Sequence, residues 1–209
     1  YGSEEAGAEL DRLGGVGWQS RKARMKKRVL EMADALLRIA AARKLREAPK
    51  LVPPQGLYDE FCARFPYEET DDQKVAIDTV LDDLAAGRPM DRLICGDVGF
   101  GKTEVALRAA ALAALAGKQV VVSAPTTVLV RQHYETFKAR FERTGLKVAS
   151  LSRLSDAADR KRVKAGLADG SISVVVGTGA VASENVEYAK LALVAILVVY
   201  QEWLARTVR

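Results

Sequence analysis

The chain has 209 residues, of which 49% are hydrophobic and 28% are charged, and its formal net charge is +5. That length and hydrophobic content allow one α/β domain with a sizeable core and an appendage, and the mild positive charge suits an acidic partner such as a nucleic acid. Cys62 and Cys95 have the spacing of neither a disulfide framework nor a zinc site, which is typical of the reducing cytoplasm. We recognise no signal peptide, and the longest apolar run, Leu191 to Tyr200, is too short to span a bilayer. We therefore expect a cytoplasmic protein with no membrane segment.

The N-terminal part of the chain predicts a long basic helix. Residues 1–18 are rich in glycine and mixed in charge, and we interpret them as the tail of an upstream module. Residues 19–48 follow as a connecting helix, predicted from Ser20 to Ala48, and residues 49–70 as a proline-containing linker. Apolar residues recur along the helix at i, i+3, i+4 and i+7 spacing: Val29, Met32, Ala33, Leu36, Leu37 and Ala40. Its first turns carry only basic charges: Arg21, Lys22, Arg24, Lys26, Lys27 and Arg28. This cluster suits either phosphate or acidic-protein contacts, or a solvated face beside an apolar stripe packed on the main domain.

Residues 71–209 are predicted to form an α/β domain with a parallel sheet. Helices are predicted at 71–84, 103–116, 128–143 and 156–168, and strands at 92–95, 119–124, 147–151, 172–176 and 191–199. The strand segments are continuous runs rich in valine and isoleucine, without polar alternation. Such runs indicate a parallel sheet with helices on both faces.

A phosphate-binding loop lies between the strand predicted at 92–95 and the helix that follows. It fits the pattern G-x-x-x-x-G-K-[ST] with Gly96, Asp97, Val98, Gly99, Phe100, Gly101, Lys102 and Thr103. Glycines allow backbone N–H groups to turn toward phosphate oxygens, and a helix N-terminus adds partial positive charge. Lys102 can reach the terminal phosphates, and the Thr103 hydroxyl can ligate Mg²⁺. The loop therefore predicts a nucleotide site.

The segment from Phe65 to Gln73 precedes the first helix of the domain. The Gln73 amide can both donate to and accept from an adenine edge, and Phe65 or Tyr67 could stack on the base. The alternative is an ordinary helix start capped by Thr70, with Gln73 exposed.

Two further strand ends carry small polar residues. Thr126 and Thr127 follow the strand predicted at 119–124, and a helix N-terminus there could hold a nucleic-acid backbone or be a plain threonine cap. Thr178 follows Gly177, where the backbone could approach a phosphate closely or simply turn. His133 is the single histidine, and we interpret it as a helix-surface or packing residue.

An expected acid is missing. A P-loop motor needs an acidic residue at the end of a neighbouring strand to hold Mg²⁺ and position water. The strand predicted at 191–199 continues into Tyr200 and Gln201 without an Asp-Glu pair, and Glu202 comes several residues late.

The stretch from Met90 to Ala106 closely resembles the bacterial transcription-repair coupling factors (Mfd). RecG helicases share the Gly-Asp-Val-Gly-x-Gly-Lys-Thr core, but Phe100 and Glu104 are closer to the coupling factors. Other segments match in the same order: 13–18, 65–73, 125–129 with Gln132 and His133, and 152–154. The resemblance covers nearly the whole chain up to about residue 196.

The resemblance implies a superfamily 2 double-stranded DNA translocase that uses ATP to push stalled RNA polymerase forward and recruits excision-repair proteins. The chain would comprise the end of the polymerase-interacting module, the connecting helix and the first RecA-like motor domain. The implied ATP contacts are residues 96–103 with Glu104, Gln73 and Phe65; Lys102 and Thr103 also serve catalysis, and Thr103 holds Mg²⁺. The implied contacts to the DNA backbone, without sequence preference, are Thr126, Thr127, Arg153 and Thr178.

The chain also departs from the family pattern. The Asp-Glu-x-His box of the family falls where this chain has Leu197-Val198-Val199-Tyr200, and Gly179 stands where a histidine is usual. The second RecA-like domain, which supplies arginines to the ATP cleft, is absent from this sequence. We therefore expect nucleotide binding with poor hydrolysis. Two alternatives stay open: a RecG-like helicase fragment, and a non-hydrolysing, nucleotide-dependent interaction module that uses the basic helix.

Overall fold

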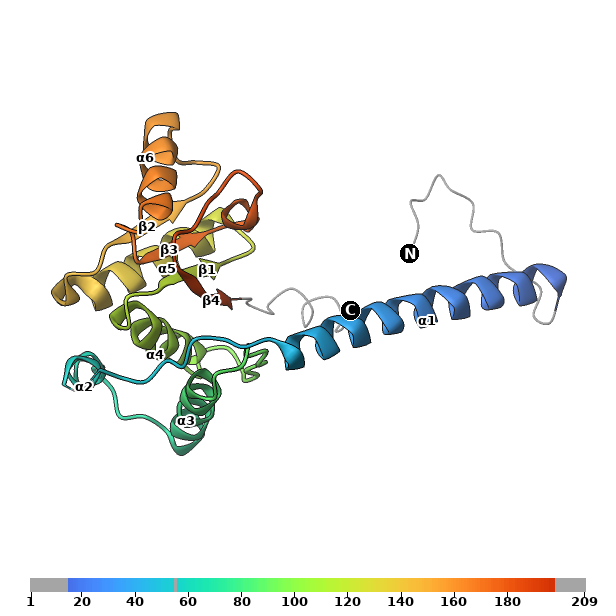
Figure 1. Ribbon diagram of the computed structural model, residues 1–209, viewed down its shortest axis with the longest axis horizontal. Helices are drawn as coiled ribbons and strands as arrows, with labels where there is room; N and C mark the ends of the chain where they lie inside the picture. Colours follow the sequence, from blue (N-terminus) through green and yellow to red (C-terminus); the bar gives the residue numbers. More distant parts are fainter. Residues whose placement is uncertain (1–14, 55, 198–209) are drawn as a thin grey trace. The chain divides into compact units, whose positions relative to one another are not determined.

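The computed structural model describes residues 15–54 and 56–197 (Figure 1). The chain divides into two compact units, Tyr1–Arg46 and Glu47–Arg209. Within the described residues, no helix is long and apolar enough to cross a membrane.

The first unit contains the long helix α1 (Val16–Leu45). The helix begins four residues before the predicted start and ends three residues before the predicted end, Ala48. Residues that precede a proline disfavour helical backbone, and Pro49 follows Ala48. Ion pairs one turn apart, Lys27–Glu31 at 3.9 Å and Arg38–Asp34 at 2.8 Å, lie along the exposed surface of α1. No residue of α1 is buried, so its apolar stripe is exposed along its whole length.

The second unit is built on four parallel strands. They are β1 (Gln119–Ser123), β2 (Val148–Leu151), β3 (Val174–Gly177) and β4 (Leu191–Ile196), in the order β2-β3-β1-β4. Because every pair is parallel, all four carboxyl ends lie at one edge of the sheet.

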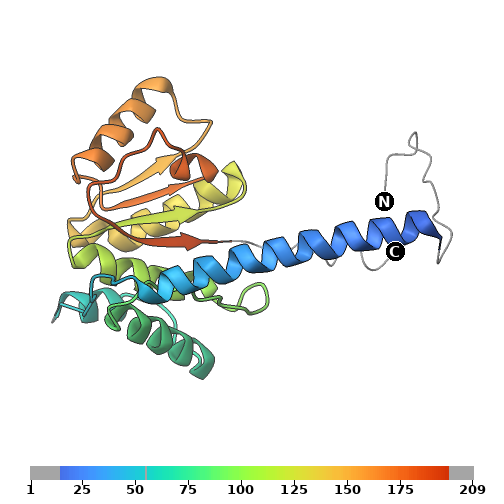
Figure 2. The same cartoon turned by 45° about the vertical axis from the view of Figure 1, so that its right-hand side comes forward.

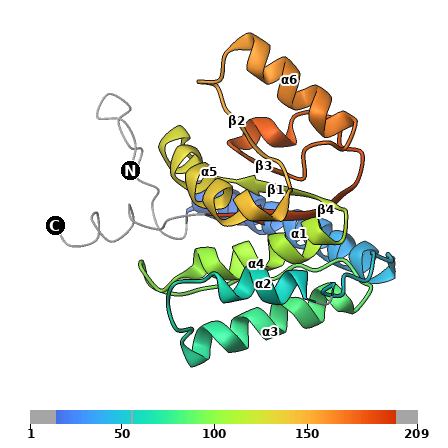
Figure 3. The same cartoon turned by 90° about the vertical axis from the view of Figure 1, so that its left-hand side faces the viewer.

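Helices cover both faces of this sheet, as predicted. They are α2 (Leu57–Ala63), α3 (Asp71–Ala85), α4 (Lys102–Leu115), α5 (Thr127–Phe141) and α6 (Ala157–Ala168), with short 3₁₀ turns η1 (Glu142–Thr144) and η2 (Gly179–Ala182). Figures 2 and 3 show α6 on one side of the sheet and α4 on the other, with α2 and α3 beyond α4. The α/β fold with a RecA-like parallel sheet is thus confirmed.

The core has two parts because side chains alternate across the strands. Val120 and Val122 of β1 pack in the larger cluster with α2, α3, α4 and α5, whereas Val121 packs with Val163 and Leu167 of α6. Burial on both faces explains the valine runs of β1 and β3. Helix α4 lies between the sheet and the outer helices, and its run Ala109–Ala114 is buried all round, which small side chains permit.

Three predictions about elements were wrong or incomplete. Residues 92–95 form no strand; Arg92 instead pairs with Asp83 of α3, its Nη2 2.7 Å from Oδ2, and Leu93 is exposed. An apolar run becomes a strand only where another strand offers backbone partners. Strand β4 is parallel as predicted but only partly buried: Val194 and Ile196 are exposed, because the described part of the sheet pairs β4 with β1 alone.

The third difference concerns residues 49–70, which were predicted as a linker with an adenine-recognition segment and which also contain helix α2. Its apolar Tyr58 and Phe61 are three residues apart and buried, a spacing that could have indicated one helical face.

Candidate nucleotide site

The P-loop folds into the conformation that its glycines predict. Gly99 and Gly101 have φ values of 90° and 71°, in the left-handed region that favours glycine. Helix α4 starts at Lys102, and no side chain caps it. The N–H groups of Lys102 and Thr103 are therefore available to an anion, as the helix dipole also favours.

Lys102 closes the loop on itself. Its Nζ donates to the carbonyl oxygens of Gly96 and Asp97, each at 2.6 Å. An ammonium has three donors, so one N–H remains for a phosphate oxygen. Asp97 and Val98 belong to the loop through their backbone, and the side chains of Val98 and Phe100 are exposed.

Beside the loop lies a pocket whose lining includes Lys102, Thr103, His133 and Leu197. Among the residues that line it, none is a carboxylate, and the described chain holds no group of three or more metal-ligating side chains. The loop and lysine thus suit a nucleotide triphosphate. For Mg²⁺, the Thr103 hydroxyl would be the protein ligand in this pocket, whose lining has no carboxylate.

Leu197 occupies the end of β4, where the expected acid would stand. Its backbone N–H donates to the Ser123 carbonyl at 2.8 Å, extending the pairing between β4 and β1 by one residue. Residues 198–200 of the expected box lie outside the described residues. The pocket therefore has an aliphatic side chain at the position where the motif resemblance predicts an acid.

Gln73 joins the helix start of α3 to the P-loop. Thr70 caps α3 by accepting from Gln73 N at 3.2 Å, and Gln73 Oε1 accepts in return from Thr70 N at 3.0 Å. Gln73 Nε2 donates to the Phe100 carbonyl at 2.9 Å. The capped helix start is therefore confirmed, with Gln73 also bonded to the loop, and the adenine contact stays a prediction.

The contact between Gln73 and the loop requires glycine at position 101. A Cβ on Gly101 would lie 2.3 Å from Gln73 Nε2. Since real Cβ atoms do not approach so closely, any larger residue must displace the amide. Glycine is therefore required at position 101 for two reasons: the positive φ of the backbone and the close approach of the Gln73 amide.

Phe65, the predicted stacking residue, lies among other aromatic and cationic groups. Its ring centroid is 5.6 Å from that of Tyr67 in an edge-on arrangement. The guanidinium carbons of Arg140 and Arg108 lie 5.7 Å and 6.0 Å from the Phe65 centroid. Phe65 is half-buried, whereas Tyr67 is exposed, so both aromatic candidates stay predictions.

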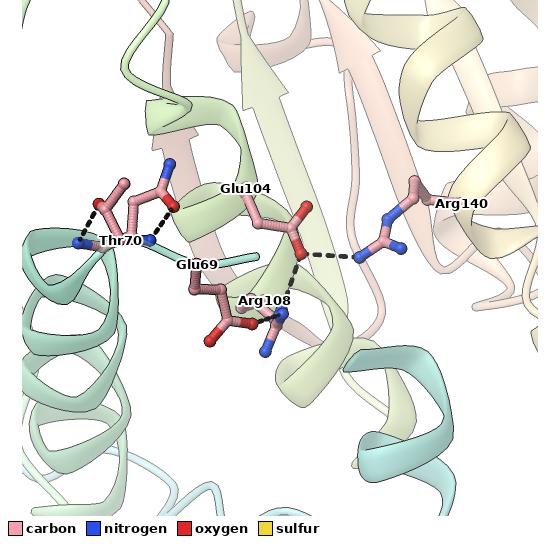
Figure 4. Close-up of polar contacts among 6 residues, drawn as sticks. Glu69, Thr70, Glu104, Arg108 and Arg140 are labelled. Atoms are coloured by element: carbon pink, nitrogen blue, oxygen red, sulfur yellow. Dashed lines mark hydrogen bonds and ion pairs between the residues drawn. The ribbon is translucent and has the colours of Figure 1, made fainter. Parts of the chain in front are cut away.

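A buried ion cluster lies directly beyond the P-loop on α4 (Figure 4). Glu104 Oε1 accepts from Arg108 Nε and from Arg140 Nη2, each at 2.7 Å, and Arg108 Nη2 also bonds to Glu69. Burial alone lowers the pKa of Arg108, but its hydrogen bonds to Glu104 and Glu69 outweigh burial and raise that pKa. For Arg140, burial dominates and lowers the pKa, although Glu104 opposes it.

Sequence reasoning included Glu104 only as a P-loop neighbour and missed Arg108, Arg140 and Glu69. Glu104 and Arg108 are four residues apart on a predicted helix, which was a detectable signal for an ion pair. Arg140 lies 36 residues from Glu104, so only the fold brings it in.

The predicted DNA contacts lie at the carboxyl edge of the sheet. Thr126 and Thr127 follow β1, Arg153 follows β2 and Thr178 follows β3. Register pairs Ser123 with Gly177 and Leu151 with Gly177, so these three strands end at one level. Thr126 caps α5 by accepting from Leu129 N at 3.3 Å, as the plain-cap alternative predicted. Arg153 is exposed and Thr178 is half-buried.

Packing explains why glycine stands at position 177 and why His133 is not at the surface. A Cβ on Gly177 would lie 2.3 Å from both the Leu151 carbonyl oxygen and Val181 Cγ1, so internal packing already requires glycine there. His133 is buried, and its Nε2 has no hydrogen-bond partner among the described residues. Burial lowers the pKa of His133 below its ordinary 6.5.

The chain is similar to known helicases. The family model for DEAD/DEAH box helicases matches residues 70–200. The chain belongs to the DEAD/DEAH box helicase family. Within this helicase family, curated relatives at 39–44% identity are transcription-repair-coupling factors, which confirms the resemblance drawn from the motifs.

Three of these relatives illustrate the extent of the match. The factors of Rickettsia conorii (strain ATCC VR-613 / Malish 7), Myxococcus xanthus and Bacillus subtilis (strain 168) are 44%, 42% and 40% identical over 200, 195 and 195 residues. The alignments cover 94%, 93% and 93% of this chain but 18%, 16% and 17% of the relatives. The chain thus spans less than a fifth of their length.

Two solved helicase structures are also similar. RecG bound to a three-way DNA junction aligns with a TM-score of 0.72 and 31% identity, covering 79% of this chain and 25% of RecG. A hypothetical ATP-dependent RNA helicase from Sulfolobus tokodaii aligns with a TM-score of 0.52 and 19% identity, covering 68% of this chain and 41% of that protein. The second likeness concerns the fold alone.

Proposed function

We propose that this chain is the ATP-binding half of an ATP-dependent double-stranded DNA translocase that acts on stalled RNA polymerase in transcription-coupled DNA repair. In this proposal residues 71–209 are the first RecA-like motor domain, and residues 1–18 end a polymerase-interacting module. The full-length protein would work in the cytoplasm with RNA polymerase and excision-repair proteins. The observation that carries the proposal is the P-loop with Gln73 bonded to it, in a chain related throughout to the coupling factors.

The proposal of ATP binding is supported by the hydrogen-bond donors and acceptors that the P-loop and Gln73 do not use within the protein. Backbone N–H groups around Gly99 and Gly101 and the remaining donor of Lys102 would hold phosphate oxygens. The Gln73 side-chain amide can make four hydrogen bonds, and two of them are already made, one with Thr70 and one with Phe100. One donor and one acceptor remain, which matches the N7 acceptor and N6 donor of adenine. Guanine offers two acceptors on that edge and would leave the second lone pair of the Gln73 oxygen without a donor.

DNA binding is proposed at the carboxyl edge of the sheet. A translocase must hold the backbone without reading bases, and phosphate contacts suit hydroxyls, N–H groups and arginine. Thr126, Thr127 and Thr178 offer hydroxyls there, and Arg153 offers a charge. These residues share the carboxyl edge of the sheet with Leu197, which follows β4, and this shared edge supports a DNA site beside the proposed nucleotide site.

Hydrolysis by this polypeptide should be poor. Bound Mg²⁺ would neutralise phosphate charge, with Thr103 as its ligand, but Leu197 offers neither a metal contact nor a base for water. We therefore expect binding without appreciable turnover.

The first experiment measures ATP binding and ATP hydrolysis by the 209-residue chain, with and without duplex DNA, beside Lys102→Ala. We expect binding that Lys102→Ala removes and turnover no higher than that of the variant. DNA-stimulated ATP turnover that depends on Lys102 would contradict the proposal that this chain alone binds ATP without hydrolysing it. Equal ATP affinity in both proteins would overturn the nucleotide site itself.

Two alternatives have specific support. The likeness to RecG favours a branched-DNA helicase fragment that does not touch polymerase. A pull-down of RNA polymerase with the chain extended by its upstream module separates the two, since a RecG-like protein should capture none. The presence of Leu197 where an acid is expected favours the second alternative, an interaction module that binds the nucleotide without hydrolysing it. In that case neutralising Arg24, Lys26, Lys27 and Arg28 should abolish partner binding and leave ATP affinity unchanged.

A further inference from the structure

The ion cluster of Glu69, Glu104, Arg108 and Arg140 joins three parts of the second unit (Figure 4). Glu104 and Arg108 lie on α4, Arg140 lies near the end of α5, and Glu69 precedes α3. Glu104 is 4% exposed and Arg108 is 6% exposed, so both charges depend on their partners. Arg140 also packs on Phe61, its guanidinium carbon 4.6 Å from the ring centroid, which offsets its two unpaired nitrogens.

Hydrogen bonds connect this cluster to the P-loop in a closed circuit. Arg108 bonds to Glu69, which is covalently next to Thr70. Thr70 forms the capping box with Gln73, and Gln73 donates to Phe100 in the loop. Glu104 completes the circuit, because it lies in the first turn of α4 and its N–H donates to the Gly101 carbonyl at 2.8 Å.

The circuit holds the segment 69–73 against α4 at two points. One point is the bond from Gln73 to the loop, and the other is the bond from Arg108 to Glu69. Ile77, Val80 and Leu84 pack α3 into the core and hold the segment on the C-terminal side of Thr70. The bond from Arg108 holds Glu69 on the N-terminal side, and together with the bond to Phe100 these contacts set the orientation of the Gln73 amide. Orientation matters because the amide must present its remaining donor and acceptor together to an adenine edge.

We infer that Arg108 is a positioning residue for adenine recognition: it orients the Gln73 amide through Glu69 and Thr70, and Glu104 with Arg140 holds Arg108 in place. The inference rests on the proposed ATP site and deepens it by assigning base selectivity to residues that do not touch the nucleotide. Arginine suits the role because its fork bonds two carboxylates at once, Glu104 through Nε and Glu69 through Nη2. Lysine has one nitrogen and could not hold both in this geometry.

The sharpest variant is Glu69→Gln. It removes the charge at the half-exposed end of the circuit and leaves the buried bonds of Glu104 intact, so the fold should survive. The second variant, Arg108→Lys, keeps the positive charge but cannot make both hydrogen bonds of the guanidinium, to Glu104 and to Glu69. The matched control is Asp83→Asn, which removes a partly exposed ion pair with Arg92 that has no link to Gln73.

The experiment measures the dissociation constants of ATP, GTP and inorganic tripolyphosphate for the 209-residue chain and each variant. We expect Glu69→Gln and Arg108→Lys to reduce the preference for ATP over GTP by about fivefold or more. Affinity for tripolyphosphate should stay within about twofold, because the P-loop is untouched, and Asp83→Asn should behave like the unchanged chain. In a Gln73→Ala background, Glu69→Gln should have no further effect on base preference.

Several outcomes would overturn the inference. They are an unchanged base preference in Glu69→Gln, an equal loss for all three ligands, or an effect that persists without Gln73. Absence of any adenine preference in the unchanged chain would do the same. Failure of the proposed function has a different signature, since Lys102→Ala would then bind tripolyphosphate as tightly as the unchanged chain.

Discussion

Gly101→Ala should destabilise the domain by two separable effects. Gly101 has a φ of 71°, and an alanine in the left-handed region costs about 1–2 kcal/mol. Its Cβ would also lie 2.3 Å from Gln73 Nε2 and displace the amide from Phe100. Loss of that hydrogen bond costs about 0.5–1.5 kcal/mol. The free energy of unfolding should therefore fall by about 1.5–3.5 kcal/mol.

Gly99→Ala is the matched control. Gly99 has a φ of 90°, and a Cβ there would meet nothing within 4 Å, so this variant bears the backbone cost alone. In urea denaturation with an m-value of about 2 kcal/mol/M, the midpoint should drop by about 0.5–1 M for Gly99→Ala and by about 0.75–1.75 M for Gly101→Ala. The difference between the variants measures the contact with Gln73.

A double-mutant cycle completes the test. In a Gln73→Ala background the two glycine variants should destabilise the protein equally, because no amide remains to be displaced. Equal midpoints for Gly99→Ala and Gly101→Ala in the unchanged background would refute the placement of Gln73 against the loop. It would also remove the support for adenine selectivity.

Three further predictions concern other parts of the domain. His133 is buried with a lowered pKa, so the unfolded chain binds its proton first; stability should fall as the pH drops through 6.5 and below, and urea midpoints between about pH 8 and pH 6 should show a smaller loss in His133→Gln. Phe141→Ala removes a fully buried ring that lies 5.1 Å from Phe61 and 6.2 Å from Phe137, and should cost about 3–5 kcal/mol in the same assay; a cost below about 1 kcal/mol would contradict the packing. Leu197→Asp places a carboxylate in the pocket with Thr103, and should make ATP affinity depend on Mg²⁺ by about tenfold more in titrations with and without a chelator; unchanged Mg²⁺ dependence would show that position 197 does not face the ion.

The sequence by itself determined the parts of this protein that depend on neighbouring residues. The valine runs at 119–123 and 174–177 predicted strands buried on both faces, because only a covered parallel sheet tolerates them. The spacing of Gly96, Gly101 and Lys102 predicted the phosphate loop, since that spacing encodes its backbone turns. Thr70 and Gln73, three residues apart, were sufficient for a helix cap.

Only the tertiary structure decided which distant groups meet. It brought Gln73 to Phe100, and it joined Glu69 to Arg108 and Arg140 to Glu104 across 39 and 36 residues. It also left residues 92–95 outside the sheet, although their apolar pattern resembled that of the true strands. The physical reason is the same in each case. Periodicity and motif spacing report which backbone conformation a segment favours, whereas a partner for a buried charge or a strand edge depends on how separate elements pack.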